Sequence, residues 1–437
     1  MNTDKIINFS DNIIDNKLID YLAGRDEVGQ IVIGQDYHLK KNKIYDFGDG
    51  YIMPTSIAIV SEKHIFPRIN SNTGCTMATI VITDFFKQFP NFDKADFIKL
   101  TEYIIGGFFY HLQFKLNYFS PLVERNKFDI NSEQYFKNIL RYGDRAVVDN
   151  FSSEIRYSEG LKDGHEKLEM DVEELLKLVK IKLGREFYIM PKKYFGSFFG
   201  GNHFFELQVA DNNKDDLFIT FHTAGDNLLR ILDKESDFYK FIVGNGLEPV
   251  NIETGQAKMF LEIVKLFINY NRAYIANTMI MIENYFNKIK PGLIIKILAI
   301  DRHDGLFKEK VNGKDYYIFR QGSISSVPGQ THILSGYYNA NSFLWQAGEN
   351  IGAAYNTIDH GMATSISSRR REKLSDNKVT LVRLKKLVNW WPLRTISQVE
   401  LIDLENDFVR HLEKKKLIKI VSRLKPIYNI KTNINGD

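Results

Sequence analysis

Several histidines lie where a strand-like segment gives way to a glycine-containing turn. Residues 219–221 and 298–302 run into His222 and His303, each followed shortly by a glycine, and the segments before His38 and His360 have the same design. Turns at the ends of strands are where a rigid scaffold usually carries binding and catalytic side chains. Each histidine taken singly is better explained by a structural role, but four repetitions of one local design weaken that explanation and point to a functional site.

The cysteine, Cys75, follows Gly74 and is the only one in a chain with ten histidines. A thiolate combined with imidazoles is a sound ligand set for a divalent transition metal. The spacing of these residues is long and irregular, and no zinc-finger or HExxH motif is present. Ligand chemistry alone leaves two interpretations open, a metal site and a buried, inert cysteine.

The densest group of polar candidates is the stretch from Gly200 to Glu206, which reads GGNHFFE. Paired glycines let a backbone approach a ligand closely. Side chains alternate between faces in a strand, so Asn202, Phe204 and Glu206 are predicted to point one way and His203 the other. One segment could therefore serve two neighbouring sites.

Composition places the 437-residue chain among ordinary globular proteins, with 44% hydrophobic residues and a net charge of +4. No apolar run is long enough to span a bilayer, and the N-terminus does not resemble a targeting segment. We therefore expect a cytoplasmic protein without a membrane partner. A single cysteine also excludes an intrachain disulfide.

Positive charge is concentrated near the C-terminus. Residues 361–437 carry 17 Lys and Arg against 8 Asp and Glu, including the runs 369–371 and 414–416. Such runs could engage a phosphate backbone, although a solvated helix face explains each run equally well.

Periodicity indicates mixed secondary structure without regular βαβ alternation, which predicts an α+β fold. No linker or repeat divides the chain, so we expect one domain over residues 1–437, with the basic segment 361–437 integral to it. Strands are expected at 30–34, 52–60, 216–222, 293–300, 316–320 and 379–385. Helices are expected at 168–179, from 259 to about 286, and at 401–424.

Taken in order, several motifs resemble those of the RtcB-type family of RNA-splicing ligases, over residues 31–431. They are DYH at 36–38, NTGC at 72–75, GGNHFFE at 200–206, HT at 222–223, His303, RQG at 320–322 and HG at 360–361. The GGNHFxE string is the most specific of them. The resemblance implies an RtcB-like fold, with mixed sheets and surrounding helices around a central two-metal cleft.

The resemblance also implies an activity. Such an enzyme joins RNA ending in a 3′-phosphate or 2′,3′-cyclic phosphate to RNA with a 5′-hydroxyl, in tRNA splicing or RNA repair, using GTP and two Mn²⁺ ions. The need for an activating protein stays open. The alternative is a catalytically altered paralogue that binds metal and RNA ends or nucleotide without ligation.

Residue roles follow from the resemblance alone. Cys75 is similar to the thiolate that bridges both metals, His222 and His303 complete one site, and His203 helps to form the other. His360 resembles the nucleophile that takes up GMP. The residues that resemble the guanylate pocket are Asn202, Phe204, Glu206, Ser342 and Lys431.

The chain departs from the family pattern near these residues. Asn72 stands in place of an aspartate metal ligand, which removes one negative charge and is expected to weaken binding of the second metal. Thr364 and Asp226 replace arginines that could neutralise phosphate. Tyr337 lies in an altered serine loop, and Leu393 aligns with an expected tyrosine.

Overall fold

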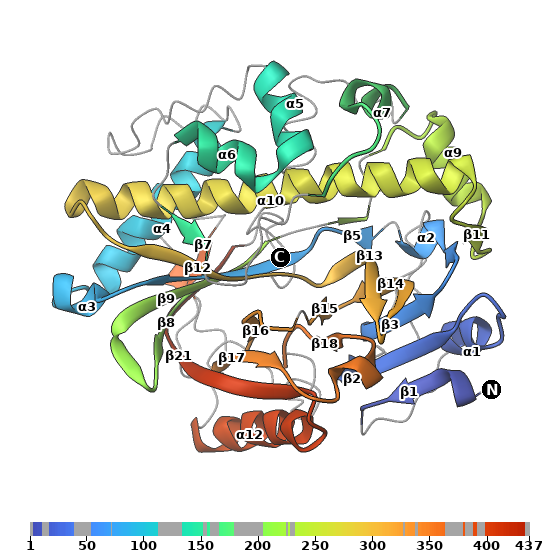
Figure 1. Ribbon diagram of the computed structural model, residues 1–437. Helices are drawn as coiled ribbons and strands as arrows, with labels where there is room; N and C mark the ends of the chain where they lie inside the picture. Colours follow the sequence, from blue (N-terminus) through green and yellow to red (C-terminus); the bar gives the residue numbers. More distant parts are fainter. Residues whose placement is uncertain are drawn as a thin grey trace.

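The computed structural model describes most of the chain (Figure 1). The described residues are 3–10, 17–38, 54–70, 72–111, 133–151, 155–157, 166–178, 204–223, 226–227, 232–326, 328–336, 340–362, 379–380, 388–390 and 398–432. They form a mixed α/β structure, as the sequence predicts. Among the described helices, none is long and apolar enough to cross a membrane.

A ten-stranded mixed sheet dominates the fold, with the path β16-β17-β21-β8-β9-β6-β12-β7, with β20 paired to β21 and β19 paired to β20. Its strands are β6 (Thr76–Ile82), β7 (Arg156–Tyr157), β8 (Phe205–Ala210), β9 (Asn213–Thr223), β12 (Ile295–Arg302), β16 (His332–Leu334), β17 (Ser342–Ala347), β19 (Val379–Thr380), β20 (Val388–Trp390) and β21 (Ile418–Thr432). Every residue of β6 is buried, because this central strand is covered on both faces.

A second sheet has five strands in the order β1-β2-β3-β14-β13. They are β1 (Ile6–Asn8), β2 (Gln30–His38), β3 (Thr55–Ser61), β13 (Asp304–Val311) and β14 (Lys314–Gln321). The chain leaves the large sheet at Arg302 and enters this sheet at Asp304, so His303 is the single residue between the two. The remaining short pairs are β4 (His64–Ile65) with β11 (Val250–Asn251), β5 (Asn72–Thr73) with β10 (Asp226–Asn227), and β15 (Ser323–Ser325) with β18 (Thr357–Asp359).

Helix α10 (Gly255–Ile289) confirms the long helix predicted from periodicity and crosses one face of the large sheet (Figure 1). Its N-terminus is capped by Thr254, whose hydroxyl accepts the Ala257 N–H at 3.2 Å. Apolar side chains along the helix pack with Ala78, Ile80 and Ile82 of β6 in the largest core cluster. Burial of each large apolar side chain stabilises this arrangement by about 1.5–3 kcal/mol.

The other helices surround the sheets. They are α1 (Lys17–Ala23), α2 (Pro67–Asn70), α3 (Phe85–Gln88), α4 (Lys94–His111), α5 (Glu133–Tyr142), α6 (Asp144–Phe151), α7 (Val172–Leu178), α9 (Asp237–Gly244) and α12 (Gln398–Lys414), with 3-10 turns η1 (Thr3–Lys5) and η3 (Ile351–Ala354). Figure 1 shows α5, α6 and α7 on the outer side of α10, and α12 at the opposite side of the molecule.

The predicted helix over 401–424 is wrong in its second half. Helix α12 ends at Lys414, Lys416 has a left-handed φ of 57°, and the chain continues as strand β21 between β17 and β8. Apolar residues four apart, such as Ile420 and Leu424, satisfy both a helical and an alternating pattern. Residues 418–432 form a strand because they pair with the two neighbouring strands β17 and β8.

Candidate metal centre and active site

Three potential metal ligands that are far apart in the sequence converge in the structure. The Cys75 Sγ lies 3.1 Å from the His222 Nε2, which lies 3.0 Å from the His303 Nε2. The three donor atoms all lie within 4.8 Å of one another, and all three residues are buried. Thiolate sulfur and imidazole nitrogen at this separation fit one transition-metal ion.

Strand ends bring these ligands together. His222 lies near the end of β9 and pairs with Met77 of β6, which places it next to the start of β6, where Cys75 lies. His303 joins the two sheets, and its backbone N–H donates to the Cys75 carbonyl at 3.0 Å. Two of the strand ends that the sequence singled out, those at His222 and His303, therefore meet beside Cys75, at the junction of the ten-stranded and five-stranded sheets.

The backbone around Cys75 is held by helix α10. The Asn271 Nδ2 donates to the Gly74 carbonyl and to the Thr76 hydroxyl, the latter at 3.0 Å. The Thr76 hydroxyl also donates to the Gly74 carbonyl at 2.9 Å. Gly74 adopts a φ of 93°, which favours glycine at this position. A buried amide on the helix thus holds the peptide before the thiol and the side chain of the residue after it.

His360 lies beside these ligands. Its ring stacks on that of His303 at a centroid distance of 4.3 Å and lies 5.9 Å from that of His222. The His360 Nδ1 contacts the Gly322 carbonyl at 2.7 Å, and because a carbonyl only accepts, Nδ1 carries the proton. Burial lowers the His360 pKa, against the raising effect of this hydrogen bond. The neutral ring therefore has its lone pair on Nε2, the nucleophilic atom.

Asp359, the residue before His360, anchors strand β18. The Asp359 carboxylate accepts the N–H groups of Gln35 and Asp36, at 3.2 and 2.9 Å, and the Ser56 hydroxyl. A side chain on Gly34 would collide with this carboxylate, so the β2 backbone can wrap it only with glycine there. Burial raises the Asp359 pKa, and these hydrogen bonds oppose the increase. These hydrogen bonds attach strand β18, and with it His360, to the five-stranded sheet.

A row of buried polar side chains runs from Glu206 to Ser342. The Gln208 Nε2 donates to the Glu206 carboxylate at 2.5 Å and to the Ser342 hydroxyl at 3.0 Å. The Gln208 Oε1 accepts from the Thr220 hydroxyl at 2.8 Å, which contacts the Thr79 hydroxyl at 3.0 Å. We call Glu206, Gln208, Thr220, Thr79 and Ser342 the polar row. It brings together two residues predicted for the guanylate pocket.

The structure shows less of the other residues predicted for the site. Phe204 is partly buried, with its ring 5.8 Å from that of His222. The backbone of Asn72 pairs with Asn227, and that of Lys431 pairs with Asn389. The predicted residues Asn202 and His203 lie outside the described residues, as do the departures Thr364, Tyr337 and Leu393.

Three residues of the site went unnoticed in the sequence: Gln208, Asn271 and Asp359. The alternation argument applied to Glu206 could have found Gln208, which lies two residues further along the same strand. Asn271 carries a weaker signal, a polar residue on the buried side of an apolar helix. Asp359 adjoins His360 in the sequence, but nothing local reveals its partners.

The fold and site together define a mixed α/β protein with a possible buried metal site. The chain belongs to the RtcB tRNA-splicing ligase family, whose sequence profile matches residues 50–432. Members of this family are RNA ligases, so membership implies RNA ligase activity and an RNA substrate. A comparison with curated proteins gave no match.

Proposed function

We propose that this protein is a GTP- and Mn²⁺-dependent ligase that joins RNA 3′-phosphate or 2′,3′-cyclic phosphate ends to 5′-hydroxyl ends through a guanylylated His360. The observation that carries the proposal is the stacking of the His360 ring on His303, beside the Cys75 and His222 ligand atoms. A nucleophile and metal ligands in contact are what phosphoryl chemistry requires.

Cys75, His222 and His303 would hold metal, with His203 and Asn72 contributing to a second site. Two bound dications would neutralise the phosphate charge that builds up during attack. The ligand chemistry suits Zn²⁺ as well as Mn²⁺, so the choice of manganese rests on the family.

In the first step, the His360 Nε2 attacks the α-phosphate of GTP. A phosphorus–nitrogen bond forms, the bond to the β-phosphate oxygen breaks, and pyrophosphate leaves. The Gly322 carbonyl holds the Nδ1 proton and so aims Nε2 at the phosphate throughout. The ring needs no base to deprotonate it, because it is neutral before the attack.

The guanylate would lie on Phe204, Glu206 and Ser342, with Asn202 and Lys431 completing the pocket. A carboxylate at Glu206 accepts from the N1–H and the amino group of guanine. Adenine has neither the N1–H nor the amino group of guanine at these positions, so the buried Glu206 carboxylate favours guanine over adenine.

A 2′,3′-cyclic phosphate would first be opened by water to the 3′-phosphate. An oxygen of the 3′-phosphate then attacks the phosphorus of the guanylate, which breaks the phosphorus–nitrogen bond and frees His360. Attack by the 5′-hydroxyl on the activated RNA phosphate forms the new phosphodiester and releases GMP.

The proposal is tested by incubating the protein with Mn²⁺ and GTP labelled at the α- or the γ-phosphate. We expect an acid-labile, base-stable label on the protein from α-labelled GTP only. The label should be absent in His360→Ala and retained in His411→Ala, a histidine on α12 that bonds to the Phe9 carbonyl. Label from γ-labelled GTP, or full labelling of His360→Ala, would refute the guanylylation.

A second candidate, the paralogue that binds without ligation, is favoured by the charge changes near the ligands. Asp226, in place of an arginine, pairs with Thr73 on the strand that leads to Cys75. A protein that binds RNA ends and metal but takes no label from GTP would support this candidate over the ligase.

A further inference from the structure

The RQG motif at residues 320–322 contributes one group to the proposed reaction, the Gly322 carbonyl that accepts the His360 Nδ1–H. The side chain of Arg320, two residues earlier, is completely buried. Its strand, β14, lies between β3 and β13 in the five-stranded sheet. A buried guanidinium is costly unless acceptors surround it, so the groups that it contacts indicate what it holds in place.

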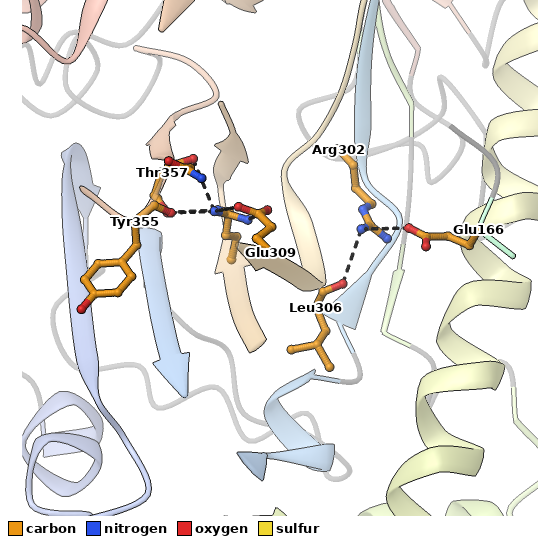
Figure 2. A network of polar contacts seen from close by, with 8 residues as sticks. Glu166, Arg302, Leu306, Glu309, Tyr355 and Thr357 are labelled. Carbon is orange, nitrogen blue, oxygen red and sulfur yellow. Dashed lines mark hydrogen bonds and ion pairs between the residues drawn. The ribbon is translucent and has the colours of Figure 1, made fainter. Parts of the chain in front are cut away.

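The Arg320 guanidinium holds three groups at once. Its Nη1 and Nη2 donate to the two oxygens of the Glu309 carboxylate, at 2.5 and 3.0 Å. Its Nε donates to the Thr357 hydroxyl at 3.0 Å, and its Nη2 also donates to the Tyr355 carbonyl at 2.9 Å. Figure 2 shows Glu309, Tyr355 and Thr357 gathered around this guanidinium. The Cζ atom lies 4.7 Å from the centre of the Phe307 ring.

The turn that these donors hold comes directly before the strand that leads to His360. Tyr355 and Asn356 have left-handed φ angles of 49° and 53°, which residues other than glycine rarely adopt. Such conformations persist only where the surrounding contacts impose them. The Arg320 Nη2 bonds to both of their carbonyls, that of Asn356 at 3.3 Å. Strand β18 begins at the next residue, Thr357. The guanidinium therefore fixes the start of β18.

The end of β14 and the residues after it thus hold β18 at both ends. Arg320 holds the start of β18, and the Gly322 carbonyl accepts the backbone N–H of His360 at 3.3 Å and its ring Nδ1–H at 2.7 Å. Only three residues, about 10 Å of extended chain, separate Thr357 from His360. A displacement at the start of so short a strand therefore moves the His360 ring relative to its acceptor.

We propose that Arg320 is a positioning residue for guanylylation, which holds β18 so that the His360 Nε2 is aimed at the α-phosphate of GTP. The inference rests on the proposed function, because it takes His360 to be the nucleophile. Within the described part of the chain, the Arg320 side chain bonds to no metal ligand and to no member of the polar row. Its loss should therefore slow the attack without weakening the binding of GTP or metal.

The test is the rate of labelling from α-labelled GTP in Arg320→Lys, measured with Mn²⁺ over a range of GTP concentrations. Lysine keeps a cation beside Glu309 but lacks the planar fork of donors, so it cannot also hold the turn before β18. Pairing with β15 still holds the middle of β18, which limits the displacement. We expect the maximal rate constant to fall about tenfold, with the half-saturating GTP concentration and the metal content unchanged.

The matched control is Arg272→Lys, which disturbs another buried arginine pair, that with Asp144. We expect its maximal rate constant to equal that of the unaltered protein. An unfolded fraction in either variant lowers the amount of labelled protein and not the rate constant of the folded molecules. The rate constant therefore separates positioning from general destabilisation.

Nuclear magnetic resonance of ¹⁵N-histidine-labelled protein, with diamagnetic Zn²⁺ in place of Mn²⁺, shows which ring nitrogen of His360 carries the proton. The His360 signals are those absent in His360→Ala. We expect the proton on Nδ1 alone in the unaltered protein and in Arg272→Lys, and a mixture of both tautomers in Arg320→Lys, because the ring moves away from its acceptor. Thr357→Val removes one acceptor of Arg320 at nearly constant shape and should cause a smaller change of the same kind.

An unchanged rate constant or an unchanged tautomer in Arg320→Lys would overturn the inference, and the same results in Thr357→Val decide against it if Arg320→Lys does not fold. Equal slowing in Arg320→Lys and Arg272→Lys would also overturn it, as would a raised half-saturating GTP concentration without slower labelling. Absence of label in the unaltered protein would refute the ligase function alone, and the tautomers would then decide whether Arg320 positions the His360 ring.

Discussion

The metal centre and the polar row both adjoin the ten-stranded sheet but are built differently. The centre combines residues at strand ends, Cys75, His222 and His303, with the stacked ring of His360. The polar row consists of residues within strands, such as Glu206 and Gln208 of β8, held by hydrogen bonds between side chains. The centre is thus positioned by backbone contacts at a junction, and the row by a continuous sheet face. Changes in one region should therefore leave the other largely intact.

The largest effect is expected from removing the thiolate. Cys75→Ala should lower metal affinity by about a hundredfold or more and abolish labelling by GTP, because a charged ligand is lost. Metal content after equilibrium dialysis measures the metal affinity, and the label on the protein after incubation with GTP measures guanylylation. The free energy of unfolding of the metal-free protein should change little. Full labelling in this variant would contradict the role of Cys75.

The opposite pattern is expected for the polar row. Gln208→Leu leaves the Glu206 carboxylate and the Thr220 hydroxyl without this shared partner, which should cost about 2–3 kcal/mol in the free energy of unfolding. GTP affinity should fall while metal affinity is unchanged. Denaturant titration checks the stability, with Gln346→Leu, a partly exposed glutamine on β17, as the matched control. A loss of metal binding in Gln208→Leu would show that the two regions are coupled.

A smaller effect on the centre is expected from the helix that supports it. Asn271→Ala removes the donors to Gly74 and Thr76 and should weaken metal binding about tenfold, as for other residues that orient a ligand. Asn269→Ala is the control on the same helix, since its amide bonds to the carbonyls of Leu140 and Glu166. If both variants weaken metal binding equally, the effect reports general destabilisation and not positioning of Cys75.

The smallest effect is expected at the substituted ligand position. Asn72→Asp restores a carboxylate and should tighten Mn²⁺ binding several-fold, because hard cations favour charged oxygen ligands. Asn227→Asp places the same charge on the paired strand. Isothermal titration with Mn²⁺ compares the two. Unchanged affinity in Asn72→Asp would show that residue 72 does not contact the metal.

Residue chemistry and resemblance predicted three residues that gather at the centre, because their types restrict their roles, and their function as metal ligands stays a prediction. A lone cysteine and histidines at strand ends have few functions, and Cys75, His222 and His303 do meet. The supporting residues could not be predicted in the same way. The partners of Asp359 are more than 300 residues distant, and an asparagine such as Asn271 is common on helices.

The fold was predictable where the hydrophobic pattern of a segment fits only one type of secondary structure. Apolar residues at 259, 260, 263 and 267 recur with helical spacing, and the position of α10 was predicted closely. Strand β21 was missed because its apolar residues also fit a helix, and only pairing with β8 and β17 separates the two. The one-domain organisation stays a prediction.

The central claim is that the sulfur of Cys75 and the ring nitrogens of His222 and His303 bind one metal ion beside His360. X-ray absorption at the manganese edge of the Mn²⁺-loaded protein tests it most directly. The account predicts a sulfur and imidazole nitrogens in the coordination shell, with the sulfur signal lost in Cys75→Ala. A shell of oxygen and nitrogen alone, identical in the two proteins, would contradict it.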